Sequence, residues 1–510
     1  MAKRVKLTFF SRLLIVLAIV AAVFFGVRWA LDNTSLGELT GQEGGGAKPV
    51  AAGDIVRVGV VDWVGYAGGQ YFNEGFEPTK DSRFYKDYGF MVDFQVINDP
   101  EASLAAWKKG DLDLHWFTLD AFPTIYESIR DYDPVILFQA DWSRGGDAIV
   151  VKRGINSVKD LKGKKVAVAE RTPSHSFLLW LLDAGGLDSE KDITIVPTAD
   201  AIQAGEFFKG GQVDAAVTWS PTDEECVRVV TGARILESTR SASNIIADIF
   251  FAKRDYVEAN RDKLQQLYEG WMIGAAEIAS DPSSKQKAIS ILAKGLNYPE
   301  SDILIDNARH TNHGDNINFF GLNSDYQGVT ADALYRRMAQ EYKALGYAEE
   351  TVPRFRNLQY PYLVQNTQLS GGIHEAEAKK TFVAVDDAEG VEKEAIATKR
   401  VSISFRTAEY ELDDNAKTLI DLQFVDIAKA FGNARIRIEG NTDNVGNRQS
   451  NIALSKRRAE AVKNYLVQEH GMSPNRFIVV GNGPDKPVAK NNTADGKAQN
   501  RRTDFELVRE

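Results

Sequence analysis

The chain has 510 residues, a hydrophobic fraction of 44% and a formal net charge of −10. This length exceeds that of one ordinary hydrophobic core, so we expect two or three domains with connectors. The negative charge argues against nonspecific binding of nucleic acid, which needs a basic face to neutralise phosphates. Cys226 is the only cysteine, so neither an internal disulfide nor a cysteine-rich metal site can form.

A basic and then apolar segment opens the chain. Four basic residues up to Arg12 precede an uncharged run from Leu13 to Val27, which Arg28 and Trp29 close. This charge order is typical of a membrane span whose N-terminus stays in the cytoplasm. A cleaved signal peptide is the alternative, but the bulky residues around Trp29 offer no small-x-small cleavage site. We therefore expect residues 1–30 to form a cytoplasmic tail and an uncleaved single-span anchor.

The remaining chain divides into two folded regions and two connectors. Residues 31–54 contain Gly44-Gly45-Gly46 and little periodicity, which predicts a flexible tether. Across residues 55–365, short apolar runs alternate with longer helical stretches, a pattern that predicts a two-lobed α/β domain with largely parallel sheets. Residues 366–399 lack a sustained apolar face and predict a second linker.

A small α+β domain is expected over residues 400–510. Its pattern indicates strands and helices in alternation, with the longest helix closed by Gly471. The expected elements are a strand at Val401–Phe405, a helix at Ala416–Phe431, a strand at Ala434–Glu439, a helix at about Ser450–His470 and a strand at Arg476–Val480.

Four spaced motifs in this last region carry a family resemblance. They are Asn441–Gly446 (NTDNVG), Asn451–Ala459 (NIALSKRRA), Gly481–Gly483 (GNG) and Asn500–Arg502 (NRR). In this order and spacing they resemble the OmpA-like peptidoglycan-binding domain. The resemblance implies a βαβαβ-type fold that binds the diaminopimelate arm of a peptidoglycan stem.

The same resemblance implies roles for individual side chains. Asp443 would hold the ammonium group of diaminopimelate and Arg458 would hold its carboxylate. An acidic acceptor beside a planar bidentate donor suits such a zwitterionic end. Asn451 is a further polar candidate, and Arg501 and its neighbour Arg502 enter as a basic pair before the terminal strand. The alternative is that Asp443 caps a turn and forms a surface ion pair with Arg458.

The central region carries a second resemblance. Its cues are Asp62–Tyr66 (DWVGY), Gly110–Asp113 (GDLD), Ser157–Val168 and Gly210–Val217. In order and spacing they resemble a periplasmic solute-binding protein of the kind that serves ABC importers, nearest to the nitrate, sulfonate and thiamine-precursor group. This implies two lobes that are joined by hinge strands and close on a ligand.

Solute contacts are expected where strands end and helices begin, because backbone N–H groups there favour small anions and polar head groups. Aromatic and hydroxyl side chains suit a small ligand with an apolar part and a polar head. The alternative is that the aromatic residues are core and the hydroxyl groups are helix caps. The candidates are Trp63, Tyr66, Thr118, Ser143, Thr172, Ser174, Ser176 and Trp219.

No catalytic residue, cofactor or metal site is predicted. His175 has no acid, cysteine or second histidine at triad or ligand spacing. His310 and His313 are three positions apart, but the surrounding Asn and Gly residues favour a loop over a metal site.

These features predict a bacterial inner-membrane protein with a single span and most of its chain in the periplasm. It would bind a small solute, an anion among the candidates, and attach non-covalently to peptidoglycan, with an ABC permease or a signalling protein as partner. One alternative is a wall-linked scaffold whose solute-binding fold holds no ligand. A second is an enzyme on that fold, which lacks a nucleophile–base pair or metal cluster. No nucleic-acid partner is expected.

Overall fold

The computed structural model describes residues 55–385, 392–403, 405 and 409–508. The predicted anchor and tether, residues 1–54, lie outside these described residues. Within the described ranges, none of the helices combines the length and apolar character that a bilayer crossing requires.

The first lobe of the central domain is built on a six-stranded sheet with the order β11-β4-β10-β3-β1-β2. Its strands are rich in Val, Ile and Phe and are mostly buried, as expected for a sheet covered on both faces. They are β1 (Ile55–Val60), β2 (Met91–Val96), β3 (Leu114–Thr118), β4 (Pro134–Ser143), β10 (Ala247–Lys253) and β11 (Ala308–His310).

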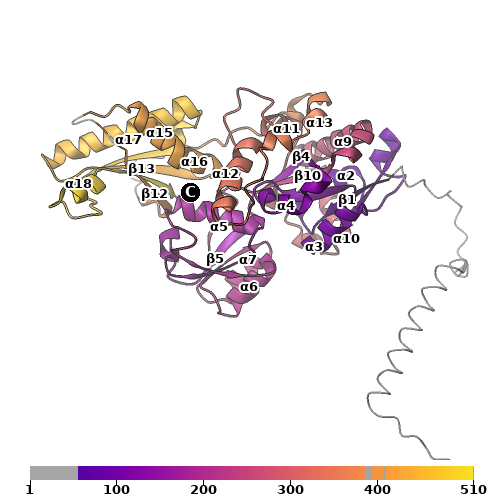
Figure 1. Ribbon diagram of the computed structural model, residues 1–510, viewed down its shortest axis with the longest axis horizontal. Helices are drawn as coiled ribbons and strands as arrows, with labels where there is room; N and C mark the ends of the chain where they lie inside the picture. The colour runs from indigo at the N-terminus through magenta and orange to yellow at the C-terminus, as the bar shows by residue number, and fades with distance from the viewer. Residues whose placement is uncertain (1–54, 386–391, 404, 406–408, 509–510) are drawn as a thin grey trace, which may run out of the picture. The chain divides into compact units, whose positions relative to one another are not determined.

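Helices pack around this sheet, with α2 lying against α9 through facing small residues (Figure 1). Several begin at an Asp, Asn or Thr whose side chain accepts a backbone N–H, as at Asp99 and Asp281. The helices are α2 (Ala67–Phe72), α3 (Pro100–Lys109), α4 (Tyr126–Ile129), α8 (Arg254–Ala259), α9 (Arg261–Ser280), α10 (Pro282–Leu296), α11 (His313–Phe319), α12 (Ala331–Ala344) and α13 (Tyr362–Asn366).

The second lobe carries a five-stranded sheet with the order β7-β6-β8-β5-β9. Its longest helix, α5, begins with Pro173 directly after the cap residue Thr172, where proline is well tolerated. The elements of this lobe are β5 (Asp147–Val151), β6 (Lys165–Val168), α5 (Pro173–Ala184), β7 (Thr194–Pro197), α6 (Ala201–Lys209), β8 (Ala215–Trp219), α7 (Thr222–Val229) and β9 (Arg234–Ser238).

The chain crosses between the lobes twice. It leaves the first lobe between β4 and β5 and returns between β9 and β10. The two-lobed α/β architecture expected from the sequence is therefore confirmed. The expectation of largely parallel sheets is wrong, because β10 runs antiparallel to both β3 and β4, and β5 runs antiparallel to β8 and β9. β5 and β10 are each the first strand after a crossing, so they enter their sheets from the other lobe and not through the crossover helix of a parallel unit.

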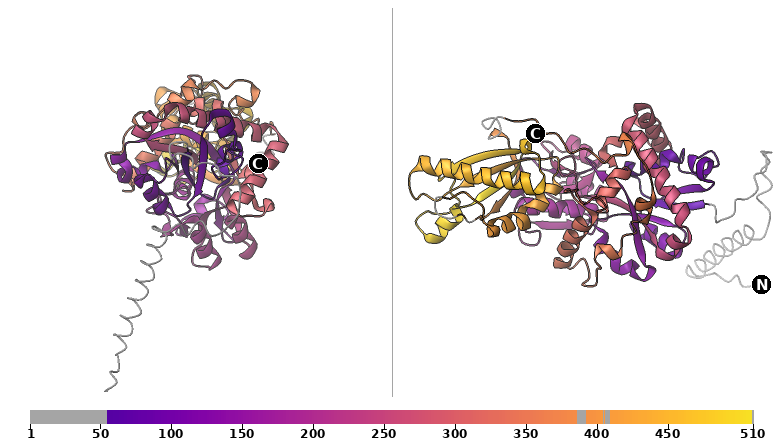
Figure 2. Two further views of the ribbon diagram at one scale, coloured as in Figure 1. Left: turned by 90° about the vertical axis from the view of Figure 1, so that its right-hand side faces the viewer. Right: turned by 90° about the horizontal axis from the view of Figure 1, so that it is seen from above.

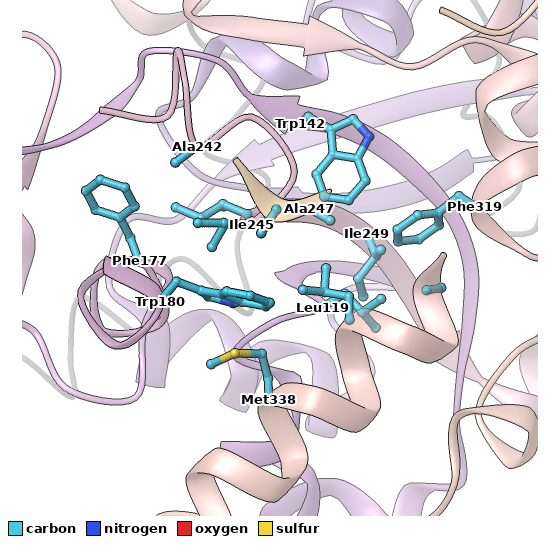
Figure 3. Close-up of a cluster of buried hydrophobic side chains, with 14 of the residues drawn as sticks. Leu119, Trp142, Phe177, Trp180, Ala242, Ile245, Ala247, Ile249, Phe319 and Met338 are labelled. Atoms are coloured by element: carbon cyan, nitrogen blue, oxygen red, sulfur yellow. The ribbon is translucent and has the colours of Figure 1, made fainter. Parts of the chain in front are cut away.

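An apolar cluster joins the lobes beside the return crossing (Figure 3). Phe177 and Trp180 come from α5 of the second lobe, whereas Met338 comes from α12 of the first. Figure 3 shows the Trp180 ring between Ile245 and Met338. These three side chains and that of Phe177 are buried. Burying a side chain of this size contributes about 1.5–3 kcal/mol, so these contacts stabilise the approach of the two lobes.

The C-terminal domain has a four-stranded sheet with the order β12-β15-β13-β14. β13 and β14 are parallel and are connected through α17, while β15 is antiparallel to β12 and β13. The elements are β12 (Ala395–Val401), α15 (Asp414–Ile420), the π-helical turn η12 (Asp421–Val425), α16 (Asp426–Ala430), β13 (Arg435–Asn441), α17 (Arg448–His470), β14 (Phe477–Gly483), α18 (Ala494–Asn500) and β15 (Thr503–Val508).

The helices α15, α16 and α17 cover one face of this sheet (Figure 1). Figure 2 shows the long helix α17 lying along the sheet from a second direction. Phe424 stacks on Phe505 between the two layers, with ring centroids 3.9 Å apart. Gly471 ends α17 at φ 59°, a conformation that favours glycine. The helix end expected from the sequence is thereby confirmed.

Part of the segment predicted as a second linker contacts the first lobe. The Asn312 amide donates to the backbone carbonyls of Ile373 and Glu375 at 3.1 and 2.7 Å. Glu377 forms an ion pair with Arg144 at 2.8 Å. These contacts hold the beginning of the segment, while β12 starts within its final residues at Ala395.

Candidate functional site

A pocket of about 400 Å³ opens on the C-terminal domain where β13, β15 and α18 meet. Arg458 reaches it from α17, and Arg501 reaches it from the turn after α18. Its other walls include Phe405, Gly440, Asn441 and Thr503. Arg502 also lines the pocket, with its guanidinium paired to Asp504, so three arginines and one aromatic ring surround it.

Asp443 lies beside this pocket, in the loop between β13 and α17. Its Oδ1 accepts the backbone N–H of Val445 at 3.0 Å, which fixes the loop as an Asx turn. Its Oδ2 accepts Nη1 of Arg501 at 2.7 Å. The side chain is largely buried, while that of Arg501 is half exposed. Asp443 is thus held by the loop backbone and paired with a half-exposed cation.

Arg458 is buried on α17, where a backbone carbonyl and an aromatic ring contact its guanidinium. Its Nε donates to the backbone carbonyl of Glu409 at 3.0 Å, and its guanidinium lies 4.6 Å from the centroid of the Phe405 ring. Burial and the positive charge of Arg501 lower the pKa of Arg458, while Asp443 acts in the opposite direction. A carboxylate entering the pocket would meet a preoriented donor here.

The structure brings together three of the four residues predicted for this site. Asp443, Arg458 and Arg501 interact with one another, with Arg501 paired directly to Asp443. The simple pairing of Asp443 with Arg458 that the alternative required is replaced by this arrangement. Asn451 instead donates from Nδ2 to the carbonyl of Val445 at 2.9 Å, so it holds the loop that carries Asp443.

In the central domain, the predicted aromatic residues contact buried acids. Trp63 donates from Nε1 to Oδ2 of Asp141 at 3.3 Å. Tyr66, at the end of the short helix η3 (Val64–Tyr66), donates to Oδ1 of Asp248 at 2.7 Å. Thr118 ends β3 and is directly paired with Asp248 on β10. These three candidates therefore lie around the paired acids Asp141 and Asp248, at the end of the first-lobe sheet where β3 and β4 finish.

Ser143 lies where the chain leaves the first lobe. Its hydroxyl donates to Oδ2 of Asp147 at 2.7 Å and lies 2.8 Å from Oγ1 of Thr239 on the return crossing. It therefore ties the two crossings together. Trp219 ends β8 and is paired with Asp147 across the second-lobe sheet.

The three hydroxyl candidates at the start of α5 have different surroundings. Thr172 donates to the carbonyl of Ala169 at 2.7 Å, so its hydroxyl stays within its own turn. Ser176 lies 2.8 Å from the hydroxyl of Tyr342, which belongs to the first lobe. Ser174 is buried beside them. The start of α5 is therefore a contact between the lobes.

Sequence reasoning missed a group of buried acids around these residues. They lie on both lobes, and the signal that could have found them is an acid inside or beside an apolar strand, where such residues are rare. The group consists of Asp120, Asp141, Asp147, Asp223 and Asp248.

Burial raises the pKa of each of these carboxyl groups. The pKa of Asp120 rises to about 7, and that of Asp141 to about 8. The values for Asp147 and Asp223 both rise to about 6. The pKa of Asp248 rises well above its ordinary value, through burial and then through the neighbouring charge of Asp141. The ionised forms are therefore costly unless a positive charge approaches.

The histidines considered in the sequence each have a separate neighbour. His175 accepts the backbone N–H of Arg171 at 3.2 Å through Nδ1. His310 Nε2 lies 2.9 Å from the carbonyl of Val64, and His313 Nδ1 lies 2.9 Å from the hydroxyl of Tyr268. His310 and His313 are thus directed at different partners.

Comparison with protein-family models identifies both folded regions. Residues 404–501 match the OmpA family, and residues 79–285 match the family described as NMT1/THI5 like. The chain joins an NMT1/THI5-like domain to an OmpA domain. Both resemblances inferred from the sequence motifs are therefore confirmed.

Curated relatives align with the OmpA domain. Outer membrane protein A of Bordetella avium is 42% identical over 97 residues, which cover 19% of this chain and 49% of that protein. The peptidoglycan-associated lipoprotein of Pseudomonas putida is 43% identical over 95 residues, or 19% of this chain and 55% of that protein. The chain thus spans about half the length of these two relatives.

Among solved structures, the periplasmic aliphatic sulphonate binding protein SsuA of Escherichia coli aligns with the NMT1/THI5-like domain. The alignment covers 64% of this chain and 97% of SsuA, with 21% sequence identity and a TM-score of 0.49.

Proposed function

We propose that this chain is an inner-membrane-anchored envelope protein that binds a small solute between its two lobes and attaches non-covalently to peptidoglycan. The observation that carries the proposal is the pocket of the OmpA domain, which Arg458 and Arg501 line and beside which Asp443 pairs with Arg501. One acid and two arginines leave a net positive site. Such a site suits a stem whose end carries a carboxylate as well as an ammonium group.

Recognition of diaminopimelate would divide between the two fixed charges. Its carboxylate would accept hydrogen bonds from Arg458, whose guanidinium is already oriented by Glu409 and Phe405. Its ammonium group would approach Asp443 and displace part of the contact with Arg501, whose side chain is half exposed and free to move toward solvent. Arg501 would then be available to the second carboxylate of the stem.

Sedimentation of the full chain with purified peptidoglycan sacculi tests this assignment. We expect Arg458→Gln to weaken binding about tenfold or more, because a hydrogen bond to a charged group contributes about 1.5–3 kcal/mol. Asp443→Asn should weaken binding similarly. Free diaminopimelate should compete with the sacculi for the unaltered protein.

Arg448→Gln provides a matched control on the same helix. Arg448 pairs with Asp485 at the surface and is absent from the pocket lining, so this variant should bind sacculi normally. Normal binding by both Arg458→Gln and Asp443→Asn would contradict the proposed site. Melting temperatures of all variants would separate lost binding from lost folding.

The solute-binding part of the proposal is supported by polar side chains at the facing edges of the lobes. Trp63 and Tyr66 come from the first lobe, and Ser176 and Trp219 come from the second. Two chain crossings between the lobes permit hinge closure around a ligand. An ABC permease or a signalling protein would then recognise the closed form.

The anchor part is supported by the sequence of residues 1–30 alone. A tether of 22 residues, from Asn33 to Asp54, would span about 25 Å as a coil and about 75 Å when fully extended. Together with the folded domains, this reach would allow a chain anchored in the inner membrane to touch the wall.

A wall-linked scaffold is the second candidate. It is favoured by the direct contacts between the lobes, including Ser176 with Tyr342 and the apolar cluster around Trp180. Such a protein would hold the wall without responding to any solute. The ligand experiment described below distinguishes these functions.

A further inference from the structure

Two acids and a threonine form a row across the first-lobe sheet. Asp248 on β10 is directly paired with Asp141 on β4 and with Thr118 on β3. Directly opposed residues of antiparallel strands project their side chains from the same face. The three side chains therefore point the same way, toward the side where Trp63 and Tyr66 reach the acids.

Two polar atoms in this row could each form a hydrogen bond with a ligand. Among the residues described by the structure, Asp141 Oδ1 and Thr118 Oγ1 have no hydrogen-bond partner. Asp141 is completely buried and Thr118 is 2% exposed. A buried polar atom left unpaired costs about 1–3 kcal/mol, so both atoms are suited to a group that enters between the lobes.

The surrounding charges have the same sign. Within the described part of the chain, the charged groups that raise the pKa of Asp248 are the carboxylates of Asp141, Asp120 and Asp147. Asp147 also acts on Asp141. Asp223 differs from the other acids of this group, because the positive charge of Arg240 lowers its pKa. A solute that brings a positive charge would relieve this repulsion, whereas an anion would add to it.

Aromatic rings complete the site. Tyr66 contacts Asp248 and lies 6.2 Å from Trp116, measured between ring centroids. Trp63 contacts Asp141, and Trp219 is paired with Asp147 on the opposite lobe. The electron-rich faces of such rings attract organic cations.

The start of α5 does not require an anionic solute. This helix has 12 residues, and its N-terminal dipole favours a negative charge. Ser176 in its first turn lowers the pKa of Asp120 from the first lobe, so this carboxyl group lies close to the start of the helix. The protein thus supplies its own acid at the position where an anionic solute was expected from the sequence.

We propose that the solute is a small organic cation, an amine or ammonium compound, whose nitrogen lies against Asp141 and Asp248 and whose apolar part contacts Trp63 and Trp219. This assignment rests on the proposed solute-binding function and names its ligand class. It replaces the anion expected from strand ends and helix N-termini.

Calorimetric titration of the full chain at pH 7.5 tests this assignment with four probes: putrescine, choline, ethanesulfonate and calcium ion. We expect binding of at least one organic cation, and at least tenfold weaker binding to Asp141→Asn and Asp248→Asn. Asp131→Asn, which removes an exposed acid of the same lobe, should bind normally. Repeating the titration in buffers of different ionisation enthalpy should show proton release, since the raised pKa values keep Asp141 partly and Asp248 largely protonated at this pH and the cation favours their ionised forms. Asp120, Asp147 and Asp223 lie near these two acids, and their lower pKa values leave them largely ionised before the cation binds.

The outcomes separate the two proposals. Binding of ethanesulfonate or calcium ion alone would overturn the organic-cation assignment and leave solute binding intact. No binding of any probe would contradict both and favour the scaffold. Cation binding without proton release, and unaffected by either substitution, would place the ligand elsewhere and overturn this site. The proton measurement needs no variant, so it holds even if a substitution prevents folding.

Discussion

At the scale of single residues, the burial of Asp141 opposes folding. This residue lies in a strand that is otherwise almost entirely apolar, and it is completely buried. Trp63 supplies one hydrogen bond, which offsets only part of the cost of removing a carboxylate from water. Arg458 in the OmpA domain is comparable, because burial and Arg501 both oppose its charge. In both residues burial shifts the pKa toward the uncharged form, as is common at binding sites.

The raised pKa of Asp141 predicts a pH-dependent stability. Because its pKa of about 8 exceeds the ordinary value of 3.8, the folded state binds more protons than the unfolded state between these values. Its contribution to stability is therefore full below about pH 4 and is lost as pH rises through about 8. We expect Asp141→Asn to stabilise the ligand-free protein at pH 8 by about 1–3 kcal/mol, measured by urea unfolding.

The same substitution should change stability little at pH 5, where the acid is already protonated. The other raised acids, Asp120, Asp147, Asp223 and Asp248, will leave a residual pH dependence. Asp131→Asn should follow the unaltered protein at both pH values. Equal effects of Asp141→Asn at pH 5 and pH 8 would show that the substitution acts through packing instead of charge.

At the scale of elements, close helix packing determines how the first lobe is assembled. α2 approaches α9 so closely that a Cβ on Gly274 would lie 2.2 Å from the carbonyl oxygen of Gly68. A Cβ on Gly69 would lie 2.5 Å from the ring of Trp271. Glycines on both helices thus permit the contact, and η3 with Trp63 and Tyr66 directly precedes α2. The position of the aromatic residues depends on this packing.

Gly274→Ala is therefore expected to destabilise the NMT1/THI5-like domain. Alanine favours an isolated helix by up to about 1 kcal/mol, but the clash with backbone cannot be relieved by a side-chain rotation. We expect a net loss of about 1–3 kcal/mol, seen as a lower melting temperature. Gly372→Ala is the control, since a Cβ there meets no atom within 4 Å. A melting temperature unchanged in Gly274→Ala would refute the close approach.

At the scale of the whole molecule, the proposed function depends on two attachments made by one chain. The OmpA domain would hold the wall, and the apolar segment Leu13–Val27 would hold the inner membrane. The solute-binding domain lies between them in the sequence, so solute binding and wall binding would take place on a protein of fixed location. The extension of the tether would limit how far that location varies.

Fractionation of cells that express the full chain tests the anchor. We expect the protein to stay with inner membranes after an alkaline carbonate wash, which releases proteins held only at the surface. A version in which residues 1–30 are replaced by a cleavable secretion signal should move to the soluble periplasm and still sediment with sacculi. Release of the unaltered protein by carbonate, or a mature N-terminus beyond residue 30, would contradict the anchor.

The sequence by itself determined what depends on local pattern. Strand and helix alternation predicted the α/β class, Gly471 marked the end of α17, and four spaced motifs identified the OmpA domain. Periodicity and short motifs predict such features because each feature depends on residues that are close together in the sequence. Sheet direction was not encoded in this way, and the expected largely parallel sheets proved to be mixed.

Only the tertiary structure decided which distant side chains share a site. Asp141 and Asp248 are more than a hundred positions apart in the sequence, yet they are paired across two strands. Arg501 reaches Asp443 from the far end of its domain. A single acid within an apolar strand does not alter the periodicity by which the strand is predicted. The net charge of a site depends on every charged side chain that folding brings to it. The proposal of a cation in place of a small anion rests on acids of both lobes that are far apart in the sequence.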